Sequence, residues 1–190
     1  MIKKINIKLI VILLIIIIVF LLFGVFNLQD KILKRIYPQK YKEYVEKYGV
    51  QYNVDKNLVY AVIKAESNFE ESAKSNKGAQ GLMQLMETTA KDINKKIDNP
   101  INENEISNKL QEPEYNINLG TRYLALLIEK YQNIEIALTA YNAGIGTVDT
   151  WIENGTIKSD GTDIENVPYK ETNNYVRKII RAYKIYNEIY

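Results

Sequence analysis

The longest apolar run in the chain, LIVILLIIIIVFLLFGVF at residues 9–26, restricts the local fold more than any other feature. It contains 18 residues without a charge, and a helix of that length can cross the hydrocarbon core of a bilayer with slight help from its flanks. A cleaved signal peptide is the alternative, but the run exceeds the usual signal-peptide core and no small-x-small cleavage site follows it. We therefore expect residues 1–28 to form an uncleaved transmembrane anchor, followed by a juxtamembrane linker at 29–36.

The residue types that are missing restrict the chemistry. The chain has no His and no Cys, which excludes Ser-His-Asp and Cys-His catalysis, His-ligated metal sites and disulfides. Acid–base chemistry must then fall on Asp, Glu, Lys or Tyr. A formal net charge of +2, with no nucleic-acid-binding motif, does not favour a nucleic acid as the partner.

Helical periodicity and helix-end signals dominate the rest of the chain. Pro38 suits a first helical turn and Gly49 a helix end, while Asp55 and Asn133 suit N-caps and Gly144 a left-handed C-terminal position. No strand pair and no internal repeat is evident, so the expected fold class is all-α. The expected helices are 37–50, 56–66, 81–93 (or a turn leading into it), a short one near 103–110, 114–131, 134–144, a short one near 147–155, and 171–190.

Several tyrosines fall at helical spacing in the first of these segments. The simplest interpretation of this stripe is a packing face, and sugar binding is the alternative. The residues concerned are Tyr37, Tyr41, Tyr44, Val45 and Tyr48.

One carboxylate, Glu66, follows the apolar stretch AVIKA and lies beside a helix face formed by Leu58, Ala61, Val62 and Ala65. Burial disfavours the charged form of a carboxyl group, so such a Glu can stay protonated near neutral pH and act as a general acid. Cleavage of a glycosidic bond requires such an acid. The alternative is a structural acid at a helix end, satisfied by backbone N–H groups or by a nearby Lys.

Four separated motifs carry a resemblance to a known family. They are VDKNLVYAVIKAES (54–67), SNKGAQGLMQLM (75–86), ALTAYNAG (137–144) and VPYKETNNYVRKI (167–179). In this order and spacing they resemble the catalytic domain of the soluble lytic transglycosylases, family 23 of the glycoside hydrolases. The resemblance runs from about Tyr37 to the C-terminus, and implies that residues 37–190 form a lysozyme-like helical domain with a groove for a glycan strand.

The resemblance also implies roles for individual residues. Glu66 corresponds to the single catalytic acid of the family. Met83 and Met86 are most simply core residues, although the resemblance places Met86 in the groove, where a thioether can adapt to a sugar face. Gly78 and Gly81 suit positive φ or close backbone approach. The implied substrate-binding residues are Ser67, Ser75, Gln84, Met86, Tyr141, Asn142, Glu171 and Tyr175.

The reaction implied by the resemblance is lytic transglycosylation of peptidoglycan, without a metal or other cofactor. The sequence offers no obvious second catalytic carboxylate, and Glu171 is the strongest candidate for one. Two alternatives remain: a lysozyme-type muramidase of the same fold, and a non-catalytic glycan-binding protein or secretion-apparatus component. The expected partners are glycan strands and, through the N-terminal helix, the membrane. Because peptidoglycan lies outside the cytoplasmic membrane, we expect a single-pass protein with its catalytic domain on the cell-wall side.

Overall fold

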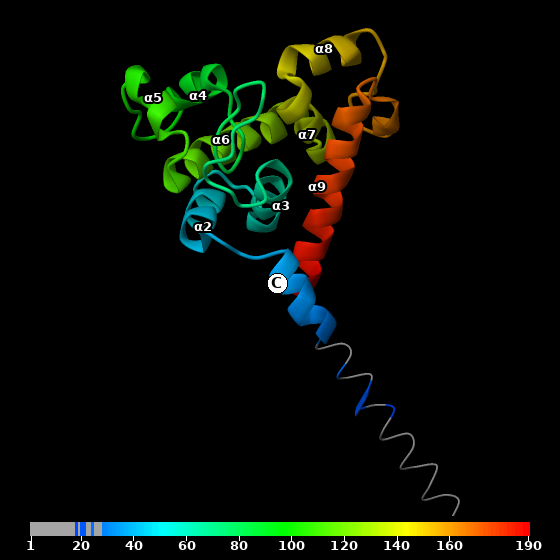
Figure 1. Cartoon of the computed structure of the whole chain (residues 1–190). Helices are drawn as coiled ribbons and strands as arrows, with labels where there is room; N and C mark the ends of the chain where they lie inside the picture. Colours follow the sequence, from blue (N-terminus) through cyan, green and yellow to red (C-terminus); the bar gives the residue numbers. More distant parts are fainter. Residues whose placement is uncertain (1–17, 19, 22–23, 25–27) are drawn as a thin grey trace, which may run out of the picture. The chain divides into compact units, whose positions relative to one another are not determined.

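The computed structural model describes residues 18, 20, 21, 24 and 28–190 (Figure 1). The chain divides into two units, Met1–Pro38 with Ile189, and Gln39–Glu188 with Tyr190. In the first unit, residues 28–36 are helical. The transmembrane helix expected from the sequence lies largely outside the described residues. Among those that are described, no helix has both the length and the apolar character needed to span a membrane.

The second unit is built from helices, which confirms the all-α expectation (Figure 1). Within the described part of the chain, β-structure is limited to the isolated bridges Lys74–Gln80 and Gln80–Leu85. The helices are α2 (Lys42–Gln51), α3 (Lys56–Glu66), α4 (Glu87–Asn94), α5 (Glu103–Lys109), α6 (Pro113–Tyr131), α7 (Ile134–Ala143), α8 (Ile145–Glu153), the 3-10 helix η1 (Ile164–Asn166) and α9 (Lys170–Ile189).

The expected N-caps are present. The Asp55 carboxylate accepts a hydrogen bond from the backbone N–H of Asn57 (2.8 Å), and the Asn133 side chain accepts one from Ile136 N–H (3.0 Å). Both satisfy donors that the first turn of a helix leaves free. Gly144 ends α7 with φ +90° and ψ 146°, which is positive φ but not the left-handed helical conformation expected.

Two expected boundaries, those at Gly49 and Pro38, were wrong. Gly49 does not end its helix, because α2 continues to Gln51. A Cβ at Gly49 would lie 3.0 Å from the carbonyl oxygen of Val54, so this glycine permits close packing of backbone segments. Pro38 does not open α2, which begins at Lys42 after Tyr41 in a left-handed conformation. For residues 81–93, the alternative of a turn leading into a helix is correct, since α4 begins only at Glu87.

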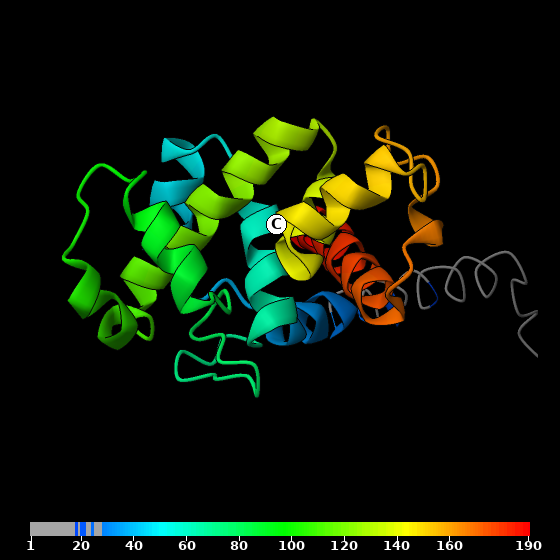
Figure 2. The same cartoon turned by 90° about the horizontal axis from the view of Figure 1, so that it is seen from above.

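Helix α3 is the central element of this unit. Seven consecutive residues, Asn57–Ile63, are buried, so α3 is covered on all sides rather than on one face. The two views show it between α2 and α9 (Figures 1 and 2). Burial of the whole helix explains why α3 is apolar around most of its circumference.

Helix α9 runs antiparallel to α3 and is joined to it along its length. Tyr183 donates a hydrogen bond to Asp55 (2.7 Å) at one end, and the rings of Tyr186 and Tyr60 stack with centroids 5.5 Å apart. On α9, Ile179, Ala182 and Tyr186 are buried. These contacts fix the register between the two helices, and this register determines what lies beside the end of α3.

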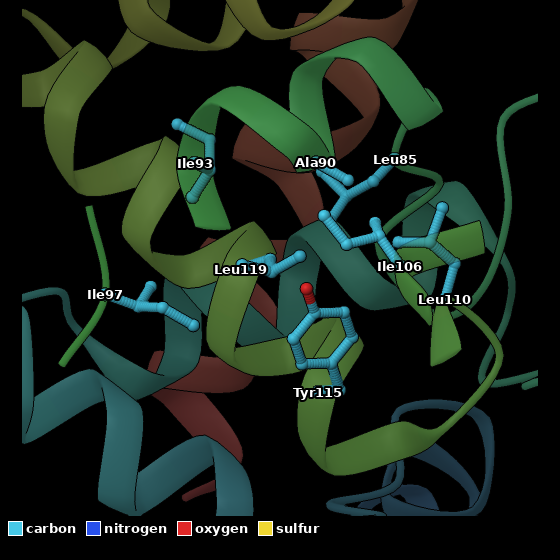
Figure 3. Close-up of a cluster of buried hydrophobic side chains, with 8 residues drawn as sticks. All are labelled: Leu85, Ala90, Ile93, Ile97, Ile106, Leu110, Tyr115 and Leu119. Atoms are coloured by element: carbon cyan, nitrogen blue, oxygen red, sulfur yellow. The ribbon is translucent and has the colours of Figure 1, made fainter. Parts of the chain in front are cut away.

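Two hydrophobic clusters lie on the α6 side of α3. The side chains of the first converge from the second motif and from α4, α5 and α6 (Figure 3). The second joins α6, α7 and α8 around residues that include Trp151 and Val148. Tyr123 and Tyr141 pack against both clusters, so the junction of the two clusters is marked by these two tyrosines. The first cluster comprises Leu85, Ala90, Ile93, Ile97, Ile106, Leu110, Tyr115 and Leu119.

Candidate active site

Glu66 is the last residue of α3 and lies three positions after the buried run Asn57–Ile63. Its side chain is partly buried. The Tyr175 hydroxyl of α9 donates a hydrogen bond to Glu66 Oε1 (2.6 Å). One helical turn further along α9, Lys178 Nζ donates to the carbonyl oxygen of Ala65 (2.8 Å). The antiparallel register of α3 and α9 thus brings Tyr175 and Lys178, 109 and 112 positions after Glu66, to the end of α3.

Burial raises the pKa of Glu66 from 4.5 to about 7, against the opposing effects of the Tyr175 hydrogen bond and the positive charge of Lys178. A carboxyl group with this pKa is populated in both protonation states near neutral pH. It can therefore deliver a proton as an acid and then accept one as a base, which is the condition for efficient general acid–base catalysis.

Two further tyrosines, Tyr141 and Tyr123, extend the group of aromatic side chains at this site. The Tyr141 hydroxyl donates to the carbonyl oxygen of Met83 (2.8 Å), and the Tyr141 ring lies 5.0 Å from that of Tyr123. Burial is the main cause that raises the pKa of Tyr141 and of Tyr175, and the negative charge of Glu66 is the second cause. Both phenols therefore remain protonated donors. Tyr123 was not identified from the sequence, although it occupies the buried face of α6 four residues before Leu127.

The second motif forms a tight loop held by its own side chains. Gln84 has φ +46°, and its side-chain amide donates to the carbonyl oxygens of Ala73 and Gly81, each at 2.9 Å. Ser75 Oγ accepts from the backbone N–H of Ala79 (3.0 Å). These contacts fix the loop, and contact of Gln84 and Ser75 with substrate stays a prediction.

Asn116 of α6 holds the same loop, and its role was not evident in the sequence. Its side-chain oxygen accepts from Met83 N–H (2.7 Å), and its amide group donates to the carbonyl oxygens of Gln80 (3.0 Å) and Leu110 (2.7 Å). Gly81, at φ +79°, leaves no room for a Cβ beside this amide. The signal available in the sequence was an Asn among the apolar residues of this helix. The structure buries its side chain fully, and a buried amide needs hydrogen-bond partners.

Ser67 and Met86 lie at the two ends of this loop region. Ser67 Oγ donates to the carbonyl oxygen of Leu82 (2.8 Å) and accepts from Phe69 N–H (3.1 Å), tying the end of α3 to the second motif. Met83 is fully buried, but Met86 is 41% exposed. The core interpretation therefore holds for Met83 and is wrong for Met86, whose thioether is free to contact a ligand.

The remaining two candidates come from the third and fourth motifs. The side-chain oxygen of Asn142, at the end of α7, accepts a hydrogen bond from the Thr172 hydroxyl (2.8 Å), which joins α7 to the start of α9. Glu171 is exposed and precedes Tyr175 by one helical turn, so both project from the same side of α9. Among the described residues, no cluster of three or more acidic side chains could hold a metal ion.

Comparison with known proteins defines the class to which this helical domain belongs. Residues 43–164 match the family model described as "Transglycosylase SLT domain". The chain is a member of the SLT transglycosylase domain family. The family resemblance expected from the sequence is thus confirmed.

Individual relatives are similar over most of this chain. The soluble lytic murein transglycosylase of Salmonella typhimurium is 35% identical over 156 residues, which cover 81% of this chain and 24% of the relative. The membrane-bound lytic murein transglycosylase C of Edwardsiella ictaluri is 38% identical over 121 residues, covering 57% of this chain and 32% of the relative. The chain therefore matches about a quarter to a third of the length of these relatives.

Solved structures agree with the fold. A 70-kDa soluble lytic transglycosylase in complex with bulgecin A has a TM-score of 0.72 and 31% sequence identity, and the match covers 82% of this chain and 25% of that one. An inactive variant of the lytic transglycosylase Slt from Pseudomonas aeruginosa, with one glutamate replaced by glutamine, has a TM-score of 0.71 and 29% identity, covering 82% and 25%. These likenesses support the expected all-α, lysozyme-like fold.

Proposed function

We propose that this chain is a peptidoglycan lytic transglycosylase that cleaves the β-1,4 bond between N-acetylmuramic acid and N-acetylglucosamine. The observation that carries the proposal is the environment of Glu66. A single carboxyl group stands at the end of a buried helix, receives a hydrogen bond from Tyr175, and has its pKa raised to about 7 by burial. Membership of the SLT family and the names of the relatives, lytic murein transglycosylases, support the same reaction and substrate.

In the proposed mechanism, protonated Glu66 donates its proton to the glycosidic oxygen as the C1–O bond breaks. The resulting carboxylate then takes the proton of the substrate's own C6 hydroxyl, whose oxygen forms a new bond to C1. The product carries a 1,6-anhydromuramic end, and no water is consumed. Because nucleophile and electrophile belong to one sugar, the attack is effectively unimolecular, and proximity replaces a second catalytic residue.

The surroundings of Glu66 support a one-carboxylate mechanism. Ordinary glycosidases use two carboxyl groups about 5–9.5 Å apart. A second carboxylate at that distance would raise the pKa of Glu66 by charge repulsion. The raised pKa of Glu66 arises instead from burial, opposed by Tyr175 and Lys178, with no contribution from another carboxylate of the described residues. We assign Glu171 a role in shaping the substrate site, together with Ser67, Ser75, Gln84, Met86, Tyr141, Asn142 and Tyr175.

The proposed substrate sets the proposed topology. Peptidoglycan lies outside the cytoplasmic membrane, so we assign residues 37–190 to a catalytic domain on the cell-wall side. Residues 1–28 form the membrane anchor in this proposal, and residues 29–36 the linker. The apolar run at 9–26 supports an anchor, as does a similar relative named as membrane-bound.

Mass spectrometry of muropeptides released from purified sacculi by the full-length chain tests the function. We expect 1,6-anhydromuramic ends from the wild-type chain, and turnover reduced by at least roughly 10²–10⁴-fold in Glu66→Gln. Glu171→Gln should lower the rate without changing the product type. Mainly reducing ends from the wild-type chain would instead identify a lysozyme. Binding of sacculi without any cleavage would identify a non-catalytic glycan-binding protein.

A further inference from the structure

The carbonyl oxygen of Ala65 loses its usual helical partner at the end of α3. In a continuing helix it would accept a hydrogen bond from the backbone N–H of Phe69, four positions later. That N–H donates instead to Ser67 Oγ (3.1 Å), and both Asn68 and Phe69 have positive φ, 50° and 67°. The chain leaves the helical path at this point, so the Ala65 carbonyl is one of the free acceptors that a helix end must satisfy in another way.

Lys178 of α9 supplies a donor for this acceptor. Its Nζ donates to the Ala65 carbonyl oxygen at 2.8 Å, and a cation at the C-terminal end of a helix also interacts favourably with the helix dipole. The Ala65 carbonyl belongs to the same planar peptide unit as the backbone nitrogen and Cα of Glu66. A bond that holds this carbonyl therefore fixes the plane from which the Glu66 side chain projects.

The charge of Lys178 also acts on the Glu66 carboxyl group. Burial raises the pKa of Glu66, while the Tyr175 hydrogen bond and, after it, the positive charge of Lys178 oppose this effect. Tyr141 of α7 also interacts electrostatically with Glu66, but its pKa is raised and it stays neutral. Lys64 of α3 is a second cation near Lys178. Lys178 thus combines two effects on Glu66, one through the backbone of α3 and one through its charge.

We propose that Lys178 is a positioning residue of the reaction: it holds the peptide plane that carries Glu66, and its charge stabilises the carboxylate that Glu66 becomes after donating its proton. This inference rests on the proposed function. The carboxylate exists between the two proton transfers, from Glu66 to the glycosidic oxygen and from the C6 hydroxyl back to Glu66. A charge that is already in place stabilises it without reorganisation. Lys178 itself transfers no proton and forms no bond to substrate in this role.

Two substitutions at Lys178 test the inference with soluble peptidoglycan strands as substrate. Lys178→Met removes the donor and the charge, and should lower kcat about two- to fivefold with KM unchanged, the range for an exposed charge pair. It should also move the decline of activity at high pH to a higher pH. Lys178→Arg keeps donor and charge, and should keep the wild-type kcat and pH profile. Arg177→Met is the matched control, because Arg177 is the neighbouring exposed cation on α9 and lines a pocket with Glu135 instead; it should behave as the wild type.

A titration of Glu66 keeps the inference testable if the chain shows no turnover. NMR of the side-chain carboxyl carbons of the full-length chain in mild detergent follows Glu66, whose signal is identified by its absence in Glu66→Gln. The titration midpoint should be higher in Lys178→Met than in the wild type, and unchanged in Lys178→Arg and Arg177→Met. An unchanged midpoint in Lys178→Met overturns the proposal. So does a lower kcat with the wild-type pH profile, because it would show a structural role alone. Wild-type inactivity on peptidoglycan would refute the proposed function, and the titration would still decide whether Lys178 acts on Glu66.

Discussion

The raised pKa of Glu66 makes a prediction about stability that is independent of any substrate. Glu66→Gln removes the ionisable group and retains the side chain's shape and an oxygen that can accept the Tyr175 hydrogen bond. In the wild-type chain the folded state holds the Glu66 proton with a pKa of about 7, and the unfolded state releases it with a pKa near 4.5. Stability from this group is therefore complete below about pH 4.5 and is lost as the pH rises through about 7.

The magnitude follows from the size of the shift. A difference of about 2.5 pKa units, at 1.36 kcal/mol each, corresponds to about 3 kcal/mol of unfolding free energy. The free energy of unfolding of the wild type, measured relative to Glu66→Gln, should thus fall by about 3 kcal/mol between about pH 4 and about pH 8. For a domain of this size that corresponds to about 6–12 °C in Tm.

Urea unfolding of the full-length proteins in mild detergent, followed by circular dichroism at a series of pH values, measures this difference. Other titrating groups are common to both proteins and cancel. Glu87→Gln is the control of opposite sign. A hydrogen bond from Lys91 lowers the pKa of Glu87, so wild-type stability relative to that variant should fall as the pH is lowered below about 4.5.

A wild-type-minus-variant difference that does not change with pH would refute the reasoning. It would mean that Glu66 ionises in the folded state as it does in water, and that burial at the end of α3 does not hold its proton. A difference that grows in the opposite direction would mean that Tyr175 and Lys178 outweigh burial, and that Glu66 is a permanently charged structural acid.

Further predictions concern the groups around Glu66 and the N-terminus. The activity of the wild-type chain should decline above about pH 7, where Glu66 loses its proton. The Tyr175 hydrogen bond lowers the Glu66 pKa in the wild type, so Tyr175→Phe should raise that pKa and move the decline to higher pH in a pH–rate profile. Asn116→Ala should lower the unfolding free energy by about 2 kcal/mol or more, since the backbone N–H of Met83 and the carbonyl oxygen of Leu110 lose their side-chain partner, and urea denaturation measures it. The intact chain should stay in the membrane fraction through high-salt washing, and a shorter mature form beginning near residue 27 would show that 9–26 is a signal peptide.

The helical elements could be read from the sequence because local rules govern them. Asp55 and Asn133 cap their helices as expected, since capping depends only on residues within one turn. Ile179 and Ala182 of α9 are three residues apart and both buried, as the helical period requires, because a helix presents residues three and four apart on one face. Gly49 was misread because its role depends on the approach of Val54, a contact formed when the chain turns back on itself.

The family and the position of the catalytic candidate can be read from the sequence alone, because ordered motifs and an acid after an apolar helix are properties of the sequence. The chemistry at Glu66, in contrast, depends on how the helices pack. Its pKa results from the burial of α3 and from Tyr175 and Lys178, which lie more than 100 residues later and reach it through the α3–α9 register. The same holds for Asn116 and Tyr123, whose partners lie on other elements. Desolvation and hydrogen bonding depend on which groups meet in space, and that is fixed only when the helices pack.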